Sequence, residues 1–200
     1  MFMEKDVSTN NCKIIIENTD IVKGQENNIL PLIPAYYADK FERISGENRY
    51  QELLAGYLLY QHLGITSDEQ LVRNKHGKPD IAPGYRCAVK SHFNLAHSGS
   101  YVVLAISDKP VGVDIERKDR LNWKVARRIL RLDQLAELES YKDDPKRLQC
   151  EFTKYWTQYE AIMKLAGTGF SGELDEAAMR EHEKRVAFKE LDEYVIAIAR

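Results

Sequence analysis

Cysteine and long apolar runs are scarce in this 200-residue chain. Its three cysteines, Cys12, Cys87 and Cys150, are widely spaced and form no CxxC motif, which argues against a disulfide framework and against a zinc site. The longest apolar run, Tyr101–Ile106, is far shorter than the roughly 20 residues of a membrane-spanning helix. The first ten residues lack the basic and apolar regions of a secretory signal. We therefore expect a soluble, cytoplasmic protein.

An excess of charge of one sign is also missing, because 29 basic residues face 31 acidic ones and the net charge is −2. This balance disfavours a protein built to bind nucleic acid through its overall charge. Hydrophobic residues make up 44% of the chain, which is typical of a folded protein and too many for a disordered one. The length allows one or two domains.

Strand and helix patterns alternate in both halves of the chain. Runs of β-branched and apolar residues predict strands at Cys12–Glu17, His92–Leu95, Tyr101–Ser107, Val111–Glu116 and, as a pair, within Val186–Arg200. Apolar spacing predicts helices at Glu47–Leu63, Asn122–Arg131, Asp133–Tyr141 and Pro145–Ala166. Strands and helices that recur in this way predict an α+β fold with two similar subdomains, residues 1–105 and 106–200.

The predicted strand Val111–Glu116 carries two carboxylates on one face. Side chains alternate along a strand, so Gly112, Asp114 and Glu116 point the same way. Oxygen ligands without His or Cys suit Mg²⁺, which takes its other ligands from water and a substrate phosphate. The small Gly112 would leave room for a ligand. The alternative is a half-exposed strand whose polar residues face water.

A second set of polar residues lies on the predicted helix before Gly167. Trp156, Glu160 and Lys164 are four residues apart and share one face. The glutamate could serve as a metal ligand or a base, and the lysine as a phosphate clamp. The alternative is a solvent-side ion pair worth about 0.2–0.5 kcal/mol.

Two predicted loops also offer groups that bind anions. The exposed loop around Lys75 and Lys78 combines positive charge with accessible backbone, although such loops often serve solubility alone. The turn Ala96–Ser100 between two predicted strands presents His97 and Ser98. No GxSxG motif is present, so we do not expect a nucleophilic serine.

The segment Arg117–Arg131 is strongly basic. Helical spacing would place Arg120, Lys124, Arg127 or Arg128, and Arg131 on one face, which would attract an acidic protein or nucleic acid. A plain solvated face is the alternative. If an acidic partner docks here, charge reversal at Arg120 and Lys124 raises its Michaelis constant.

The order of these motifs resembles one family. The elements GKP, FNxxHS, GVDIE and WxxxExxxK follow one another between Lys75 and Lys164. This succession resembles the 4′-phosphopantetheinyl transferases, in particular their Sfp-type branch. The resemblance implies a pseudo-dimer of two α+β subdomains that acts as a holo-carrier-protein synthase. Such an enzyme moves the phosphopantetheine arm of coenzyme A to a serine of an acyl, peptidyl or aryl carrier protein and releases 3′,5′-ADP.

The resemblance also implies the roles of individual residues. Asp114, Glu116 and Glu160 match the Mg²⁺ ligands, and Glu160 is also the candidate base for the serine hydroxyl. Lys164 matches the lysine that contacts the pyrophosphate and completes the catalytic pair with Glu160. The implied contacts to coenzyme A fall on Lys75, Lys78, His97, Ser98, Arg49 and Lys164, with His97 at the 3′-phosphate.

The chain departs from the family pattern at three positions. Tyr159 and Glu52 stand where the family usually has a basic residue, and Ala96 stands where it usually has serine. Arg49 lies one turn before Glu52 and would substitute for the missing arginine. We expect a monomeric enzyme that acts without nucleic acid or membrane. The alternative is a non-catalytic module of the same fold that binds coenzyme A or a carrier protein.

Overall fold

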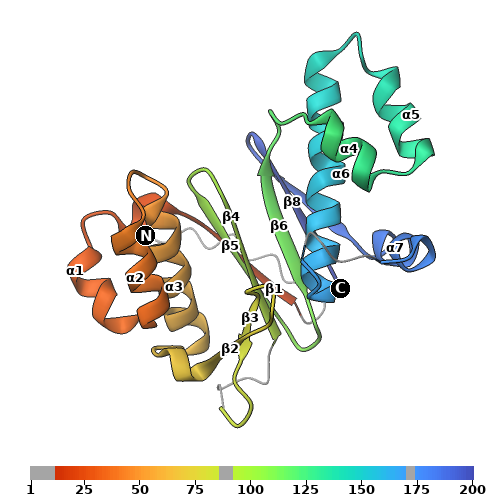
Figure 1. Ribbon diagram of the computed structural model, residues 1–200. Coiled ribbons are helices and arrows are strands. Elements are labelled where there is room, and N and C mark those ends of the chain that lie inside the picture. Colours follow the sequence, from red (N-terminus) through yellow and green to blue (C-terminus); the bar gives the residue numbers. More distant parts are fainter. Residues whose placement is uncertain (1–11, 86–91, 170–173) are drawn as a thin grey trace. The chain divides into compact units, whose positions relative to one another are not determined.

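The computed structural model describes residues 12–85, 92–169 and 174–200 (Figure 1). Cys87 therefore lies outside the described residues. The chain forms two compact units, the first ending at Val111 and the second beginning at Gly112. The division falls after Val111 rather than after residue 105, because the strand β5 (Tyr101–Ser107) belongs as a whole to the first unit. Within the described ranges, no helix is both long and apolar enough to cross a membrane.

The first unit contains an antiparallel sheet in the order β1-β5-β4. Its outer strands are β1 (Cys12–Asn18) and β4 (His92–Ser98). Leu104 of β5 lies opposite Ile15 on one side and Leu95 on the other. The remaining elements are η1 (Thr19–Val22), α1 (Glu26–Ile29), η2 (Leu30–Leu32), α2 (Ala35–Arg43), α3 (Arg49–Leu63), η3 (Asp68–Gln70), β2 (Leu71–Arg73) and β3 (Pro79–Ile81).

The helix α3 supplies more residues to the apolar core of this unit than any other element. Its buried leucines Leu54 and Leu58 belong to one cluster with Ile15 and Leu104 of the sheet. The helix ends at Gly64, whose φ of 67° is the left-handed conformation that glycine adopts readily after a helix. The predicted helix and its glycine stop are confirmed, with the first helical residue at Arg49.

The second unit also has an antiparallel sheet, in the order β6-β8-β7. It consists of β6 (Gly112–Arg117), β7 (Ala187–Leu191) and β8 (Tyr194–Ala199). The helices are α4 (Trp123–Ile129), α5 (Leu132–Ser140), α6 (Pro145–Ala166) and α7 (Glu176–Glu183). Figure 1 shows α6 lying along β6 and β8. The two three-stranded sheets share one topology. In each, the first strand (β1 or β6) pairs with the second strand of a later hairpin (β5 or β8), which is therefore central.

Local sequence explains the length and place of α6. Asp144 caps its first turn by accepting a hydrogen bond from the Arg147 amide, and Pro145 has the fixed φ that suits the first helical position. Gly167 ends the helix with a φ of 70°. On the face toward the sheet, Ala161 and Ile162 are buried with residues of β8. The predicted range of this helix is confirmed.

The loop and turn predictions need correction in two places. The segment around Lys75 is not one open loop, because Arg73 and Pro79 pair as the ends of the β2–β3 hairpin. The Asn74 side chain organises its turn by accepting hydrogen bonds from the amides of His76 and Lys78. The other hairpin has strands that run to Ser98 and from Tyr101, so its turn is shorter than Ala96–Ser100. The helix α7, which Asp175 caps, was not predicted.

Candidate functional site

The candidate site begins with Asp114 on β6 and Lys164 on α6. Alternation along the strand turns Asp114 toward the helix, where Lys164 Nζ donates to Asp114 Oδ1 at 2.7 Å. Asp114 is only 6% exposed. Its second oxygen, Oδ2, is buried without a hydrogen-bond partner among the described residues. A buried carboxylate with one unmatched oxygen is costly unless a cation or a donor reaches it.

Glu116 faces the same helix two residues along the strand. Its Oε1 accepts a hydrogen bond from Trp156 Nε1 at 2.9 Å and another from Arg120 Nη1 at 3.1 Å. The Trp156 ring also stacks on Tyr159, with centroids 6.3 Å apart. The motif tryptophan is therefore more than a core side chain, because its indole N–H orients a carboxylate of the candidate site.

Glu160 completes the group from the helix side. Burial raises its pKa to about 7, and the negative charges of Asp114 and Glu116 add to this rise while Lys164 opposes it. Burial likewise raises the pKa of Asp114 to about 6, against the attraction of Lys164. Asp114 and Glu116 thus repel Glu160, and Lys164 offsets only part of that repulsion.

Gly112 has a different role from the one predicted. A Cβ atom on this residue would lie 2.0 Å from the carbonyl oxygen of Ala161 and 2.4 Å from the amide nitrogen of Leu165. The space beside Gly112 is therefore filled by the backbone of α6, and the expectation that it admits a ligand is wrong. Glycine at this position allows the strand and the helix to approach closely.

The two alternatives without a site do not fit the structure. Asp114 is buried, so β6 is not a half-exposed strand with polar residues in water. Lys164 forms its ion pair with Asp114 across the sheet–helix contact rather than on the solvent side of α6. Trp156, Glu160 and Lys164 do share one face of α6, since each interacts with the carboxylates of β6.

The donor chemistry of this group fits a hard divalent cation. Within the described parts of the chain, no three His, Cys, Asp or Glu side chains converge closely enough to form a ready metal centre. Asp114, Glu116 and Glu160 nevertheless offer only oxygen ligands, and their mutual repulsion and the buried Oδ2 of Asp114 call for a positive charge.

The residues expected to contact coenzyme A lie in the first unit, apart from Lys164 on α6. Lys75 is exposed in the β2–β3 turn, and Lys78 Nζ donates to the carbonyl oxygen of Val111 at 3.3 Å. On β4, His97 is exposed whereas Ser98 is buried. Arg49 lies at the start of α3 with its guanidinium 3.8 Å from the centre of the Phe41 ring.

The departures from the family pattern have local explanations in two cases. Glu52 is buried and pairs with Lys40 Nζ at 2.8 Å, so this acidic residue joins α3 to α2. Ala96 is buried on β4 and points away from the exposed side of His97.

The predicted basic stripe is not one helical face. The helix α4 ends at Ile129, and Arg120 lies before it and pairs with Glu116. Arg131 lies at the N-cap position of α5, and its Nη1 donates to both carboxylate oxygens of Glu183 in α7. Lys124 and Arg127 are exposed on α4. Ion pairs thus hold part of the stripe, and its single-face arrangement is wrong.

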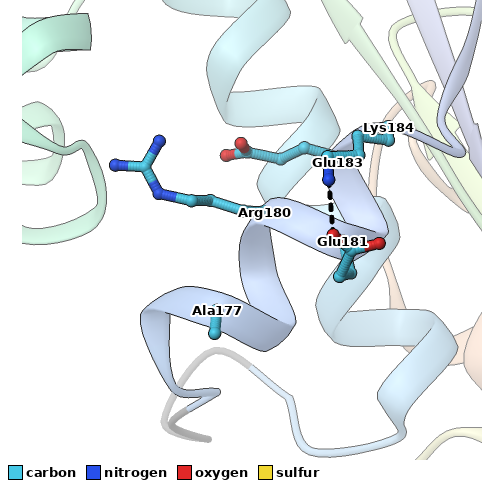
Figure 2. A pocket seen from close by; sticks show the side chains of 5 residues that line it. All are labelled: Ala177, Arg180, Glu181, Glu183 and Lys184. Atoms are coloured by element: carbon cyan, nitrogen blue, oxygen red, sulfur yellow. Dashed lines mark hydrogen bonds and ion pairs between the residues drawn. The ribbon is translucent and has the colours of Figure 1, made fainter.

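A hollow on α7 is lined by charged side chains that neutralise one another (Figure 2). Lys184 pairs with Glu181, Arg180 with Glu176, and Glu183 with Arg131. The Arg131–Glu183 pair was not predicted, because the two residues are distant in sequence and no local pattern links them. Of these three pairs, only Glu183–Arg131 attaches α7 to α5, because the other two lie within α7 and its C-terminal cap.

Comparison with known proteins gives matches to one family. Residues 110–198 match the family model described as the 4′-phosphopantetheinyl transferase superfamily. This range contains β6 and α6 and thus every candidate residue of the second unit.

Curated relatives point the same way. The chain is 31% identical over 121 residues to the 4′-phosphopantetheinyl transferase psf-1 of Bacillus pumilus, covering 60% of this chain and 49% of that protein. It is 30% identical over 117 residues to Sfp of Bacillus subtilis (58% and 50%) and 34% identical over 122 residues to AcpT of Escherichia coli (60% and 59%). The chain thus spans about half the length of the first two relatives. Residues 110–198 are thus similar to the 4′-phosphopantetheinyl transferase superfamily, and the motifs of the chain resemble those of the Sfp-type members.

Proposed function

We propose that this chain transfers the 4′-phosphopantetheine arm of coenzyme A to a serine of an apo carrier protein. One observation carries the proposal. β6 and α6 bring Asp114, Glu116, Glu160 and Lys164 into one electrostatic group, within the part of the chain that matches the superfamily. In the reaction, the serine oxygen bonds to the β-phosphorus of coenzyme A, the bond from that phosphorus to the bridging oxygen breaks, and 3′,5′-ADP leaves.

Asp114, Glu116 and Glu160 would hold Mg²⁺, to which their oxygen ligands are suited. When bound, the cation would neutralise charge on the diphosphate. The buried, unpartnered Oδ2 of Asp114 and the repulsion that raises the pKa of Glu160 support this assignment. We propose Mg²⁺ as a cofactor and coenzyme A as the second substrate.

Two side chains of α6 would supply the base and the positive charge that the reaction needs. Glu160 would accept the proton of the attacking serine hydroxyl, directly or through a water molecule, since its raised pKa suits a base near neutral pH. Lys164 would stabilise the charge that develops on the departing 3′,5′-ADP. In the first unit, Lys75, Lys78, His97, Ser98 and Arg49 would contact coenzyme A, which is a proposal that rests on the resemblance.

The direct test is the intact mass of an apo carrier protein after incubation with this chain, coenzyme A and Mg²⁺, beside a reaction with EDTA. We expect a gain of one phosphopantetheine arm that EDTA abolishes. An Asp114→Ala variant is expected to lose at least a hundredfold in rate, as is common when a charge-stabilising group is removed, while its circular dichroism stays that of the folded protein.

The same assay separates the proposal from a binding module of the same fold. If coenzyme A binds but no acyl or peptidyl carrier gains mass, the chain binds without chemistry and the transferase proposal fails. An Asp114→Ala variant with a nearly normal rate would contradict the metal assignment alone. We also propose a cytoplasmic monomer, for which light scattering of the purified chain gives the mass; the chain itself is 23.1 kDa.

A further inference from the structure

Two donors of different charge meet at one oxygen of Glu116. The neutral indole N–H of Trp156 lies 2.9 Å from Oε1, and the cationic guanidinium of Arg120 lies 3.1 Å from the same atom. Both donors hold the carboxylate in place. Only Arg120 also brings a full positive charge to an oxygen that the proposed function assigns to a divalent cation.

The two donors differ as well in how firmly they are held. Trp156 projects from the middle of α6 and packs with the apolar cluster of α4 and α5. The Arg120 side chain is 56% exposed, follows the end of β6, and lines a hollow of about 410 Å³ together with Trp156 and Phe152. Arg120 can therefore leave Glu116 without disturbing the packed core, whereas Trp156 cannot.

We infer that Arg120 is a positioning residue that competes with the metal ion for Glu116, while Trp156 orients Glu116 to receive it. The inference rests on the proposed role of Glu116 as a metal ligand. A cation next to a ligand oxygen lowers the affinity of that oxygen for a second cation, and a neutral donor fixes the direction of the oxygen without that penalty. The two partners of one atom therefore act in opposite directions on metal affinity.

Calorimetric titration of the full chain with Mg²⁺ at low salt tests this inference. Arg120→Gln is expected to bind Mg²⁺ about 1.5- to 5-fold more tightly, the range that corresponds to an exposed ion pair. Trp156→Phe keeps the aromatic packing but loses the N–H, and is expected to bind about tenfold more weakly, as for other groups that orient a metal ligand. Arg120→Lys keeps the charge and should bind like the unaltered chain.

Arg127→Gln is the matched control, because it removes the same charge from an exposed residue of α4 that does not contact Glu116 in the described structure. A gain with Arg127→Gln equal to that with Arg120→Gln would show a general charge effect and overturn the inference. An affinity of Arg120→Gln equal to or below that of the unaltered chain would also overturn it. If the unaltered chain itself binds no Mg²⁺, the metal role in the proposed function fails first.

Discussion

The first strand of each unit runs along the edge of a three-stranded sheet, but the two strands turn different side chains toward the interior. In β1, Ile15 is buried in the apolar cluster that contains Leu54 of α3. In β6, Asp114 is equally buried and faces the ammonium of Lys164 on α6. Sheets of the same strand order thus cover an apolar core in the first unit and a buried charged group in the second.

The comparison shows where the second unit gives up stability. Burial of an isoleucine contributes about 1.5–3 kcal/mol to folding. A buried ion pair contributes little to the free energy of folding, because removing both charges from water offsets most of their attraction. Apolar residues in its place often contribute more. The cluster around Asp114 is therefore hard to explain as a device for folding, and its arrangement is better explained by chemistry.

Exchanging the two interior residues gives the largest expected effect. Ile15→Asp buries an unpaired carboxylate in an apolar core and is expected to cost about 3–5 kcal/mol of unfolding free energy. Asp114→Val is expected to cost less, because the remaining Lys164 side chain is 27% exposed and stays near Glu160, while the substitution abolishes transfer. Urea unfolding followed by circular dichroism measures both. Equal losses in the two variants would contradict the comparison.

Alanine substitutions at two glycines test how closely α6 approaches β6 and how closely α3 approaches Ile33 and Tyr37. Gly112→Ala is expected to cost about 3 kcal/mol, because the new Cβ meets the backbone of α6, which cannot turn aside. At Gly56 of α3 the nearest atoms are Ile33 Cδ1 and Tyr37 Cβ, both 3.0 Å away, so the neighbours need to yield by only a few tenths of an ångström, although Tyr37 Cβ moves only with its backbone. Alanine also favours a helix by about 1 kcal/mol over glycine, so Gly56→Ala is expected to cost less than about 1 kcal/mol. Urea midpoints of the two variants decide the order.

The charged interior also predicts a dependence on pH that an apolar interior lacks. The folded-state pKa of Glu160, raised by burial and by Asp114 and Glu116, is about 7 against an ordinary 4.5. The folded state therefore holds its proton more tightly than the unfolded state, so stability falls as pH rises from about 4.5 to about 7. In EDTA at pH 8, Glu160→Gln should raise the melting temperature by about 2–4 °C, the shift for roughly 1 kcal/mol.

At pH 4.5 the same substitution should have little effect, because the carboxyl group is then already protonated in the folded state. Glu139→Gln, on the exposed side of α5, is the matched control and should leave the melting temperature unchanged at both values. A gain from Glu160→Gln that is equal at pH 4.5 and pH 8 would contradict the assigned repulsion.

A small effect on stability, and none on metal affinity, is expected from the ion pair of the first unit. Glu52→Gln weakens the contact between α3 and α2 but keeps a hydrogen-bonding side chain opposite Lys40, so the expected cost is about 1 kcal/mol. Calorimetric Mg²⁺ affinity should not change, in contrast with the loss expected for Asp114→Ala. A change in Mg²⁺ affinity with Glu52→Gln would show that the first unit contributes to the metal group.

The sequence predicted the elements whose signals are local. The alternating pattern of β6 and the four-residue spacing on α6 placed Asp114, Glu116 and Glu160 on faces that do meet. The range of α6 was predicted because a proline and a glycine mark its two ends. The short strands β2 and β3 were missed because turn-forming residues dominate that segment.

Pairings between distant residues could not be predicted. Gly112 lacks a side chain because the backbone of α6 lies against it, and no sequence pattern within β6 indicates that contact. The partner of Arg131 is Glu183 on a helix that was not predicted. Arg120 lies four residues after Glu116, yet that spacing indicates contact only in a helix, and here a strand end and a turn bring the two together.

The hydrogen bond between Trp156 and Glu116 gives the protein a built-in optical probe. The chain has two tryptophans, Trp123 and Trp156, and both lie in the second unit. Excitation at the red edge of the indole band therefore reads that unit alone, while the first unit contributes tyrosines. Because the Trp156 indole N–H donates to Glu116, which repels Glu160, we expect the Trp156 contribution to the emission wavelength to shift with the charge state of these carboxylates.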